Sequence, residues 1–148
     1  MRERREGWIL NVSSATSILP TADTFKDFDA LSILYGSTKA ALERFTAGLA
    51  AAVHRDGIWV NSMAPVGAVP TEGTEALGVV PDEALAVAES REAMAEASLA
   101  LCTTQDPKLT ARITYCTPIL EELGREVYLC DGKTKVGSAL ERDAAALR

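Results

Sequence analysis

Trp8-Ile-Leu-Asn-Val-Ser13 is apolar at nearly every position and is enriched in residues that favour strands. Such a run is typical of a strand that is covered on both faces within a parallel sheet. Ile58-Trp-Val-Asn-Ser-Met-Ala64 has the same character and is cut off by Pro65, and Arg112–Cys116 predicts a third, shorter strand. Three strands make a thin sheet, and the first of them would be an open apolar edge that other protein should cover.

The segments between the predicted strands carry helical patterns. Apolar residues recur at helical spacing from about Leu34 to His54, and Asp56-Gly57 supplies a helix stop. Pro81-Asp-Glu83 is a good helix start, and an alanine-rich stretch of one or two helices runs from it to about Leu101. The order strand, helix, strand, helix, strand predicts an α/β fold, a partial Rossmann-like parallel sheet with right-handed crossovers.

The remaining segments are predicted to be irregular. Residues 65–80 are rich in Gly, Pro and Thr and predict a loop, and residues 15–31, with Pro20 and several polar side chains, predict a loop or broken segment. The tail from Gly124 contains a turn signal at Asp131-Gly132, and a loose helix is expected from about Ser138. With 148 residues, the chain fits a single domain, residues 1–148, that is large enough to bury a core.

Composition excludes several function classes. The net charge of −6 and the scattered Lys and Arg residues argue against a nucleic-acid binder. No apolar run approaches the roughly 18 residues that a membrane helix needs. The apolar run after the basic segment Met1–Gly7 is too short for a signal peptide, so a cytoplasmic protein is expected. The spacing of the odd set Cys102, Cys116 and Cys130 predicts structural thiols, and with His54 as the only histidine we expect no metal site.

Tyr35-Gly-Ser-Thr-Lys39 places a phenol and an ammonium four residues apart at the start of a predicted helix. Residues i and i+4 lie on one helix face, one turn apart. The charge of Lys39 can therefore favour the ionised form of the phenol, and a tyrosine tuned in this way can exchange a proton with an alcohol or a carbonyl. The simpler explanation is an exposed helix pair worth a few tenths of a kcal/mol.

A serine hydrolase is a further hypothesis, because Ser14, His54 and several Asp residues are present. The chain has no Gly-x-Ser-x-Gly elbow. His54 also lies at the far end of the helix that carries Tyr35, about 28 Å away at a rise of 1.5 Å per residue. We therefore reject a hydrolase.

Ligand sites in open α/β sheets lie at the carboxyl ends of the strands, where Ser14, the Tyr35 helix and the loop after Pro65 should converge. The motifs Asn11-Val-Ser-Ser14, Tyr35-x-x-x-Lys39 and Val60-Asn-Ser-Met-Ala-Pro65 together strongly resemble the short-chain dehydrogenase/reductase family. The resemblance covers about residues 7–77 closely and the rest in the order of the elements.

The resemblance implies an oxidoreductase that uses NAD or NADP and moves hydride between the nicotinamide and a carbonyl or secondary alcohol. It implies that Ser14 holds the substrate oxygen, that Tyr35 is the acid/base, and that Lys39 activates the phenol and binds the nicotinamide ribose. The residues implied to contact the cofactor are Tyr35, Lys39, Pro65, Val69 and Thr71. The choice between NAD and NADP and the identity of the substrate stay open.

Three features depart from the family pattern. Pro65 is followed by Val66-Gly67 rather than directly by Gly, and the stretch 15–34 is longer than usual and predicts an insertion near the substrate mouth. The family also opens with a glycine-rich turn that meets the cofactor pyrophosphate, and none of the ten glycines forms such a cluster.

We therefore expect the C-terminal, catalytic half of such a fold, with residues 2–7 ending a preceding helix. Two hypotheses stay open: an oxidoreductase completed by a longer product or a separate chain, or a truncated, catalytically inactive fragment or pairing module that binds no dinucleotide. A homo-oligomer is also implied, because members of the family commonly pair through the helix that carries the tyrosine.

Overall fold

The computed structural model describes residues 1–23, 25, 27–78 and 88–136. The chain divides into two compact units, Met1–Ala64 with Leu101–Thr114 and Pro65–Ala100 with Tyr115–Arg148. In chain order the described elements are β1 (Gly7–Val12), η1 (Ala15–Ser17), α1 (Asp27–Leu31), α2 (Ile33–Val53), η2 (His54–Asp56), β2 (Ile58–Ala64), α3 (Glu72–Leu77), α5 (Arg91–Thr103), β3 (Ile113–Tyr115) and α6 (Cys116–Glu122).

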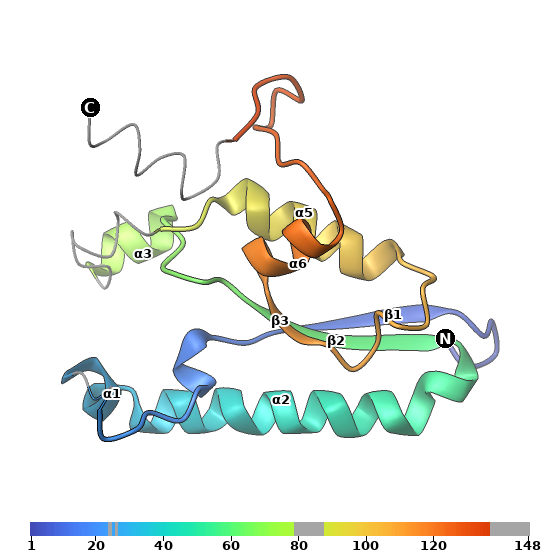
Figure 1. Cartoon of the computed structure of the whole chain (residues 1–148), viewed down its shortest axis with the longest axis horizontal. Helices are drawn as coiled ribbons and strands as arrows, with labels where there is room; N and C mark the ends of the chain where they lie inside the picture. The colour runs from blue at the N-terminus through green and yellow to red at the C-terminus, as the bar shows by residue number, and fades with distance from the viewer. Residues whose placement is uncertain (24, 26, 79–87, 137–148) are drawn as a thin grey trace. The chain divides into compact units, whose positions relative to one another are not determined.

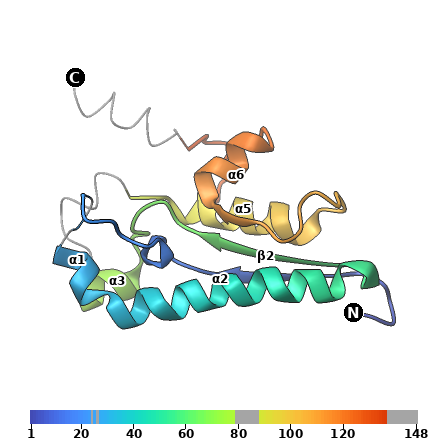
Figure 2. The ribbon, with the colours of Figure 1, turned by 60° about the horizontal axis from the view of Figure 1, so that its bottom comes forward.

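The sheet has the strand order β1-β2-β3, so β1 is an edge strand among the described strands. β1 and β2 run parallel, with Gly7 opposite Ile58 and Val12 opposite Met63. Figure 1 shows the two strands side by side with α2 running along one face of them, and the turned view in Figure 2 agrees. The predicted α/β fold with a small Rossmann-like sheet is confirmed.

The core of the first unit lies between α2 and β2. Ala50 and Val53 of α2 are buried together with Ile58 and Val60 of β2. A fully buried Val or Ile contributes roughly 1.5–3 kcal/mol relative to an exposed one. Because Ala50 and Val53 are three residues apart on one helix face, their burial fixes which side of α2 faces the sheet.

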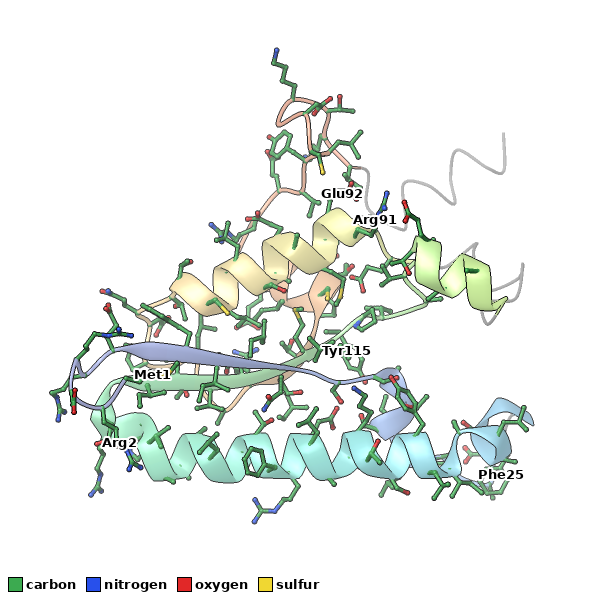
Figure 3. All side chains as sticks on the ribbon, turned by 180° about the vertical axis from the view of Figure 1, so that it is seen from behind. Met1, Arg2, Phe25, Arg91, Glu92 and Tyr115 are labelled. Carbon is green, nitrogen blue, oxygen red and sulfur yellow. The ribbon has the colours of Figure 1, made fainter. Side chains whose placement is uncertain are left out.

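The predicted stop of the long helix is confirmed at Gly57. α2 ends at Val53, η2 follows, and Gly57 adopts the left-handed conformation with φ +70°. An added Cβ at Gly57 would lie 2.1 Å from the carbonyl oxygen of Arg5, so only glycine fits this position. Arg2 bonds Asp56 at 2.9 Å at this end of α2, and Phe25 lies at the opposite end of the helix (Figure 3).

Trp8 and Trp59 are packing residues of the first unit. Their rings stack with centroids 5.9 Å apart at opposite positions on β1 and β2. The indole N–H of Trp8 donates to the carbonyl of Thr104 at 2.6 Å, and that of Trp59 donates to the carbonyl of Asp106 at 3.0 Å. Both polar atoms of this pair are therefore used inside the first unit.

One loop prediction and one strand boundary are wrong. The loop expected for residues 65–80 contains α3, whereas residues 15–31, predicted as a loop or broken segment, contain the short elements η1 and α1. The third strand ends at Tyr115 rather than Cys116, because Cys116 begins α6. The predicted helix start at Pro81 and the loose helix from Ser138 lie outside the described residues.

Each missed helix of the second unit has a local cause. Thr71 Oγ1 accepts from the N–H of Thr74, and Thr74 Oγ1 accepts from the N–H of Thr71, a reciprocal cap for α3. α6 ends in a Schellman motif, in which Arg125 donates its N–H to the carbonyl of Leu120 around left-handed Gly124.

Among the described residues, no helix is both long and apolar enough to cross a membrane.

Candidate active site

Side chains from one face of α2 hold the carboxyl end of β1. Lys39 Nζ donates to the carbonyl of Val12 at 2.8 Å. Asn11 Nδ2 donates to Thr46 Oγ1 at 2.8 Å, and Thr46 passes a hydrogen bond on to the carbonyl of Leu42. The end of β1 is therefore tied to α2 at two consecutive residues, Asn11 and Val12, just before Ser14.

The structure brings Tyr35 and Lys39 together, as their spacing predicts. The Lys39 ammonium lies over the Tyr35 ring, 5.4 Å from the ring centroid. A cation at that distance is attracted by the ring's negative face, with an energy of roughly 0.5–1 kcal/mol at an exposed site. Tyr35 is 51% exposed, and its hydroxyl makes no hydrogen bond within the described residues. The phenol is therefore open to a ligand.

The Ser14 hydroxyl bonds its near neighbour Thr16 and, among the described residues, makes no direct hydrogen bond to α2. Ser14 is the N-cap of η1, and its Oγ accepts from the N–H of Thr16 at 3.3 Å and from Thr16 Oγ1 at 3.0 Å. A serine hydroxyl has two acceptor positions and one proton to donate. Both acceptor positions are used, and within the part of the chain that the structure describes Ser14 donates to nothing. Its remaining capacity is that of a hydrogen-bond donor.

Ser14 and Tyr35 are linked through a close backbone approach rather than by a direct bond. Gly36 packs so closely on η1 that an added Cβ would lie 2.4 Å from the carbonyl oxygen of Thr16. Thr16 is also the residue that fixes the Ser14 hydroxyl. Among the described residues, no hydrogen bond joins Ser14 to Tyr35 or to Lys39. The two predicted hydroxyls are thus held on facing elements, η1 and the first turn of α2.

A cavity of about 420 Å³ lies between the start of α2 and the segment that follows Ser14. Thr16 and Gly36 line it, together with Ile18, Pro20 and Ile33. Cavities of this size are in the range that holds small ligands, and this one has a largely apolar wall.

The predicted cofactor loop belongs to the second unit. Pro65 and Val69 are half-buried, and the Thr71 hydroxyl is used as the cap of α3. The buried carboxylate of Glu89 organises this loop: it accepts from the N–H of Val66 at 2.7 Å and from Thr117 Oγ1 at 2.6 Å. The N–H of Glu89 donates to the carbonyl of Ala68 at 2.9 Å. The loop is thereby held in one conformation at its start.

Cys102 and Cys116 give no sign of nucleophilic chemistry. Burial, and then the Glu89 carboxylate, raise the pKa of the Cys116 thiol to about 12. Burial also raises the pKa of Cys102. A thiol with a raised pKa is a poor nucleophile because the thiolate is scarce. Within the described residues, no group of three or more His, Cys, Asp or Glu side chains could hold a metal ion.

Comparison with known families matches residues 1–79 to the family described as short chain dehydrogenase. The match covers more than half of the chain. The chain belongs to the short chain dehydrogenase family. A comparison with curated proteins found no match.

Solved structures of this class share the fold. A short chain dehydrogenase/reductase family protein is 30% identical, with a TM-score of 0.59 over 78% of this chain and 46% of that protein. A gluconate 5-dehydrogenase from Burkholderia cenocepacia, in complex with NADP and tartrate, is 24% identical, with a TM-score of 0.58 over 77% of this chain and 44% of its own. A short chain oxidoreductase from Burkholderia thailandensis is 23% identical, with a TM-score of 0.61 over 86% of this chain and 54% of its own. The chain therefore spans about half the length of these proteins.

Sequence reasoning missed three supporting residues, Thr16, Glu43 and Glu89. Thr16 bonds the Ser14 hydroxyl, Glu43 accepts from the serines on either side of it, and Glu89 holds the loop after Pro65. Glu43 follows Lys39 by four residues, so the same helical spacing that pointed to Lys39 could have placed it on the same face. Nothing in the local sequence marks Glu89, because its partners come from two distant segments.

Proposed function

We propose that this chain is the catalytic part of an NAD(P)-dependent oxidoreductase that transfers hydride between a nicotinamide and a carbonyl or secondary alcohol. The observation that carries the proposal is the position of Lys39. Its ammonium lies over the ring of Tyr35 and is anchored to the end of β1, two residues before Ser14. The positive charge of Lys39 is thus fixed beside the phenol of Tyr35 and close to the turn that carries Ser14.

Each polar group has a role that its hydrogen bonds support. Ser14 has only its proton left to give, which suits a group that donates a hydrogen bond to the substrate oxygen. Tyr35 exchanges a proton with that oxygen. Lys39 stabilises the phenolate by its charge, and because the ammonium is anchored to the Val12 carbonyl, it stays in place when the proton leaves.

The side chains around Lys39 fit the ribose end of a nicotinamide nucleotide. An ammonium has three N–H donors, and within the described residues Lys39 gives only one of them, to Val12. The other donors suit the paired hydroxyls of a ribose, and the exposed face of Tyr35 offers a further hydroxyl. The bound nicotinamide would accept or supply the hydride. In this proposal Pro65, Val69 and Thr71 contact its ring end, on the loop that Glu89 holds.

The test is a comparison of Tyr35→Phe with Tyr128→Phe, an exposed tyrosine of the second unit. Consumption of NADPH and NADH is followed by absorbance with a panel of small ketones and sugar acids, and nucleotide binding is followed by fluorescence. We expect Tyr35→Phe to lower turnover by roughly 10²- to 10⁴-fold, the usual contribution of a general acid or base, while binding is retained. Tyr128→Phe should leave both unchanged.

Two outcomes would contradict the proposal in different ways. Full turnover of Tyr35→Phe would remove the acid/base role of the phenol. Failure of the chain to bind either nucleotide would favour the second hypothesis, a non-catalytic fragment or pairing module. Lys39→Met tests both functions of the lysine, since it should weaken nucleotide binding as well as turnover.

We also propose that the chain forms a homo-oligomer through α2. Leu34 and Phe45 are eleven residues apart, which places them on one helix face, and they are 83% and 59% exposed. Exposed apolar side chains gathered on one face suit a contact with another protein surface. Sedimentation of the wild type and of Phe45→Lys tests this: the variant should be monomeric at concentrations where the wild type is not, and a monomeric wild type would refute it.

A further inference from the structure

One carboxylate oxygen accepts hydrogen bonds from the serines on both sides of Ser14. Glu43 Oε1 accepts from Ser13 Oγ at 2.6 Å and from Ser17 Oγ at 2.6 Å. Ser13 is 4% exposed and Ser17 is 8% exposed. Bonds of this length between a hydroxyl and a carboxylate are charge-assisted and are roughly twice as strong as neutral ones. The residues before and after the turn that carries Ser14 are therefore held to one atom of α2.

The turn between these two serines is closed by its own backbone. The N–H of Ser17 donates to the carbonyl of Ser14 at 3.0 Å, and the N–H of Ile18 donates to the carbonyl of Ala15 at 3.2 Å. A turn of three residues with two hydrogen bonds is weak by itself, since a short 3-10 segment has poor bond geometry. The Glu43 carboxylate stabilises the turn further, because it bonds both ends of the turn to the long helix α2.

The same helix presents the phenol. Tyr35, Lys39 and Glu43 follow one another at intervals of four residues and so lie along one face of α2. One path that sets the distance between the phenol and the serine hydroxyl therefore runs from Tyr35 along the helix to Glu43 and across to Ser13 and Ser17. Thr16 completes the path by its two bonds to the Ser14 oxygen.

We propose that Glu43 is a positioning residue, which holds the Ser14 hydroxyl in place by bonding the serines on either side of it. The expected effect of Glu43 on turnover rests on the proposed function, whereas its effect on the position of Ser14 does not. Glu43 does not touch the substrate. Its removal should loosen the turn and leave the rest of α2 unaltered.

The first experiment needs no activity. Amide hydrogen exchange of Ser17 and Ile18 is measured by NMR in the whole chain for the wild type, Glu43→Ala, Glu43→Gln and Arg44→Ala. Removal of Glu43 should speed the exchange of both amides at least about tenfold, since two charge-assisted bonds that oppose local opening are lost. Glu43→Gln keeps an oxygen acceptor and should stay within about threefold of the wild type. Arg44→Ala, an exposed neighbour on α2, should change neither amide.

The second experiment asks whether the effect passes through Ser14. In the wild-type background, Glu43→Ala should lower kcat by about tenfold or more with little change in KM, and Glu43→Gln should restore most of it. In a Ser14→Ala background, Glu43→Ala should cost no further turnover, because the group that it places is gone.

The outcomes separate this inference from the function on which it rests. Unchanged exchange of Ser17 and Ile18 in Glu43→Ala would overturn the placement whatever the turnover. An equal loss of turnover in both backgrounds would overturn action through Ser14. A chain without any turnover would overturn the proposed function alone, and the exchange result would still decide whether Glu43 holds the turn. If Glu43→Ala does not fold, Ser13→Ala and Ser17→Ala each remove one of the two bonds and should each speed exchange.

Discussion

Replacement of Gly36 by alanine tests the close approach of α2 to η1. An ideal Cβ at residue 36 lies 2.4 Å from the carbonyl oxygen of Thr16 and 3.4 Å from its carbonyl carbon. Backbone atoms cannot swing aside as a flexible side chain can. The helix or η1 must therefore move by about 0.6 Å or more to reach even the shortest distance that such contacts tolerate.

Two opposing effects set the change in the free energy of unfolding that Gly36→Ala causes. Alanine in place of glycine inside a helix stabilises by roughly 0.5–1 kcal/mol, because the unfolded chain loses less freedom. Forcing a methyl group into a filled space costs roughly 1–3 kcal/mol. We expect Gly36→Ala to destabilise the chain by about 1–2 kcal/mol overall.

Gly48 of the same helix provides the matched control. The nearest atom to an ideal Cβ at residue 48 is Arg44 Nη1 at 3.6 Å, the movable end of an exposed side chain. Gly48→Ala should therefore stabilise the chain by roughly 0.5–1 kcal/mol. The two variants should then differ in stability by roughly 1.5–3 kcal/mol, which for a protein of this size is a difference in Tm of roughly 3–12 °C.

The assay is thermal unfolding of the two variants and the wild type, followed by circular dichroism, with urea unfolding as a second measurement. Because Thr16 also fixes the Ser14 hydroxyl, the exchange of the Ser17 amide should rise in Gly36→Ala alone. Equal stabilisation by both substitutions would refute the close approach, and with it the packing of α2 on η1 that places Tyr35 opposite Ser14.

Three further predictions concern the rest of the molecule. With a pKa of about 12, Cys116 should resist alkylation by iodoacetamide at about pH 8, while exposed Cys130 should react. Peptide mass spectrometry measures both, and rapid labelling of both cysteines would contradict the burial of Cys116. The side chain of Asn61 is buried, donates to the carbonyl of Leu109 and accepts from the N–H of Arg112. Asn61→Leu should therefore destabilise the chain by roughly 2–4 kcal/mol in urea unfolding. A cost below about 0.5 kcal/mol would argue against those bonds. Hydrogen bonds from Lys135 and Tyr128 hold the pKa of Glu126 below its usual value, so these bonds support the 126–135 turn at pH values above the usual pKa of a glutamate. The support is lost as the pH falls through the lowered pKa. Lys135→Met should raise the pKa of Glu126 in a carboxyl NMR titration, and an unchanged value would refute the pairing.

Much of the first unit could be predicted because its signals are local. Ile58–Ala64 is a buried strand of continuous apolar character, and its observed bounds equal the predicted ones. The end of the long helix was marked by Gly57, whose left-handed backbone is a property of one residue. The pairing of Tyr35 with Lys39 needed only the helical period.

The missed elements depend on weaker or more distant signals. α3 is short, and its cap uses a Thr71–Thr74 pair where an acidic residue at the fourth position is the commoner sign. α6 carries Pro118 within its first turn, where proline is tolerated, yet the preceding strand-forming residues favoured an extended chain. The grip of Glu43 on Ser13 and Ser17 spans 30 and 26 residues and has no local marker, because a half-buried glutamate on a helix looks like any solvated one.

The anchoring of β1 to α2 has a consequence for how the chain tolerates length changes. The contacts that place Ser14 and Tyr35 come from residues 11–17 and from Gly36, Lys39 and Glu43 of α2, and the connection of residues 18–34 lies between these two groups in the sequence. An insertion there lengthens a loop, at an entropic cost that grows only slowly with its size. One residue added between Tyr35 and Glu43 would instead rotate half of the face by about 100° and point the phenol away from the serine turn. A change of length in residues 18–34 should therefore leave the spacing from residue 35 to residue 43 unaltered, whereas that interval itself cannot change.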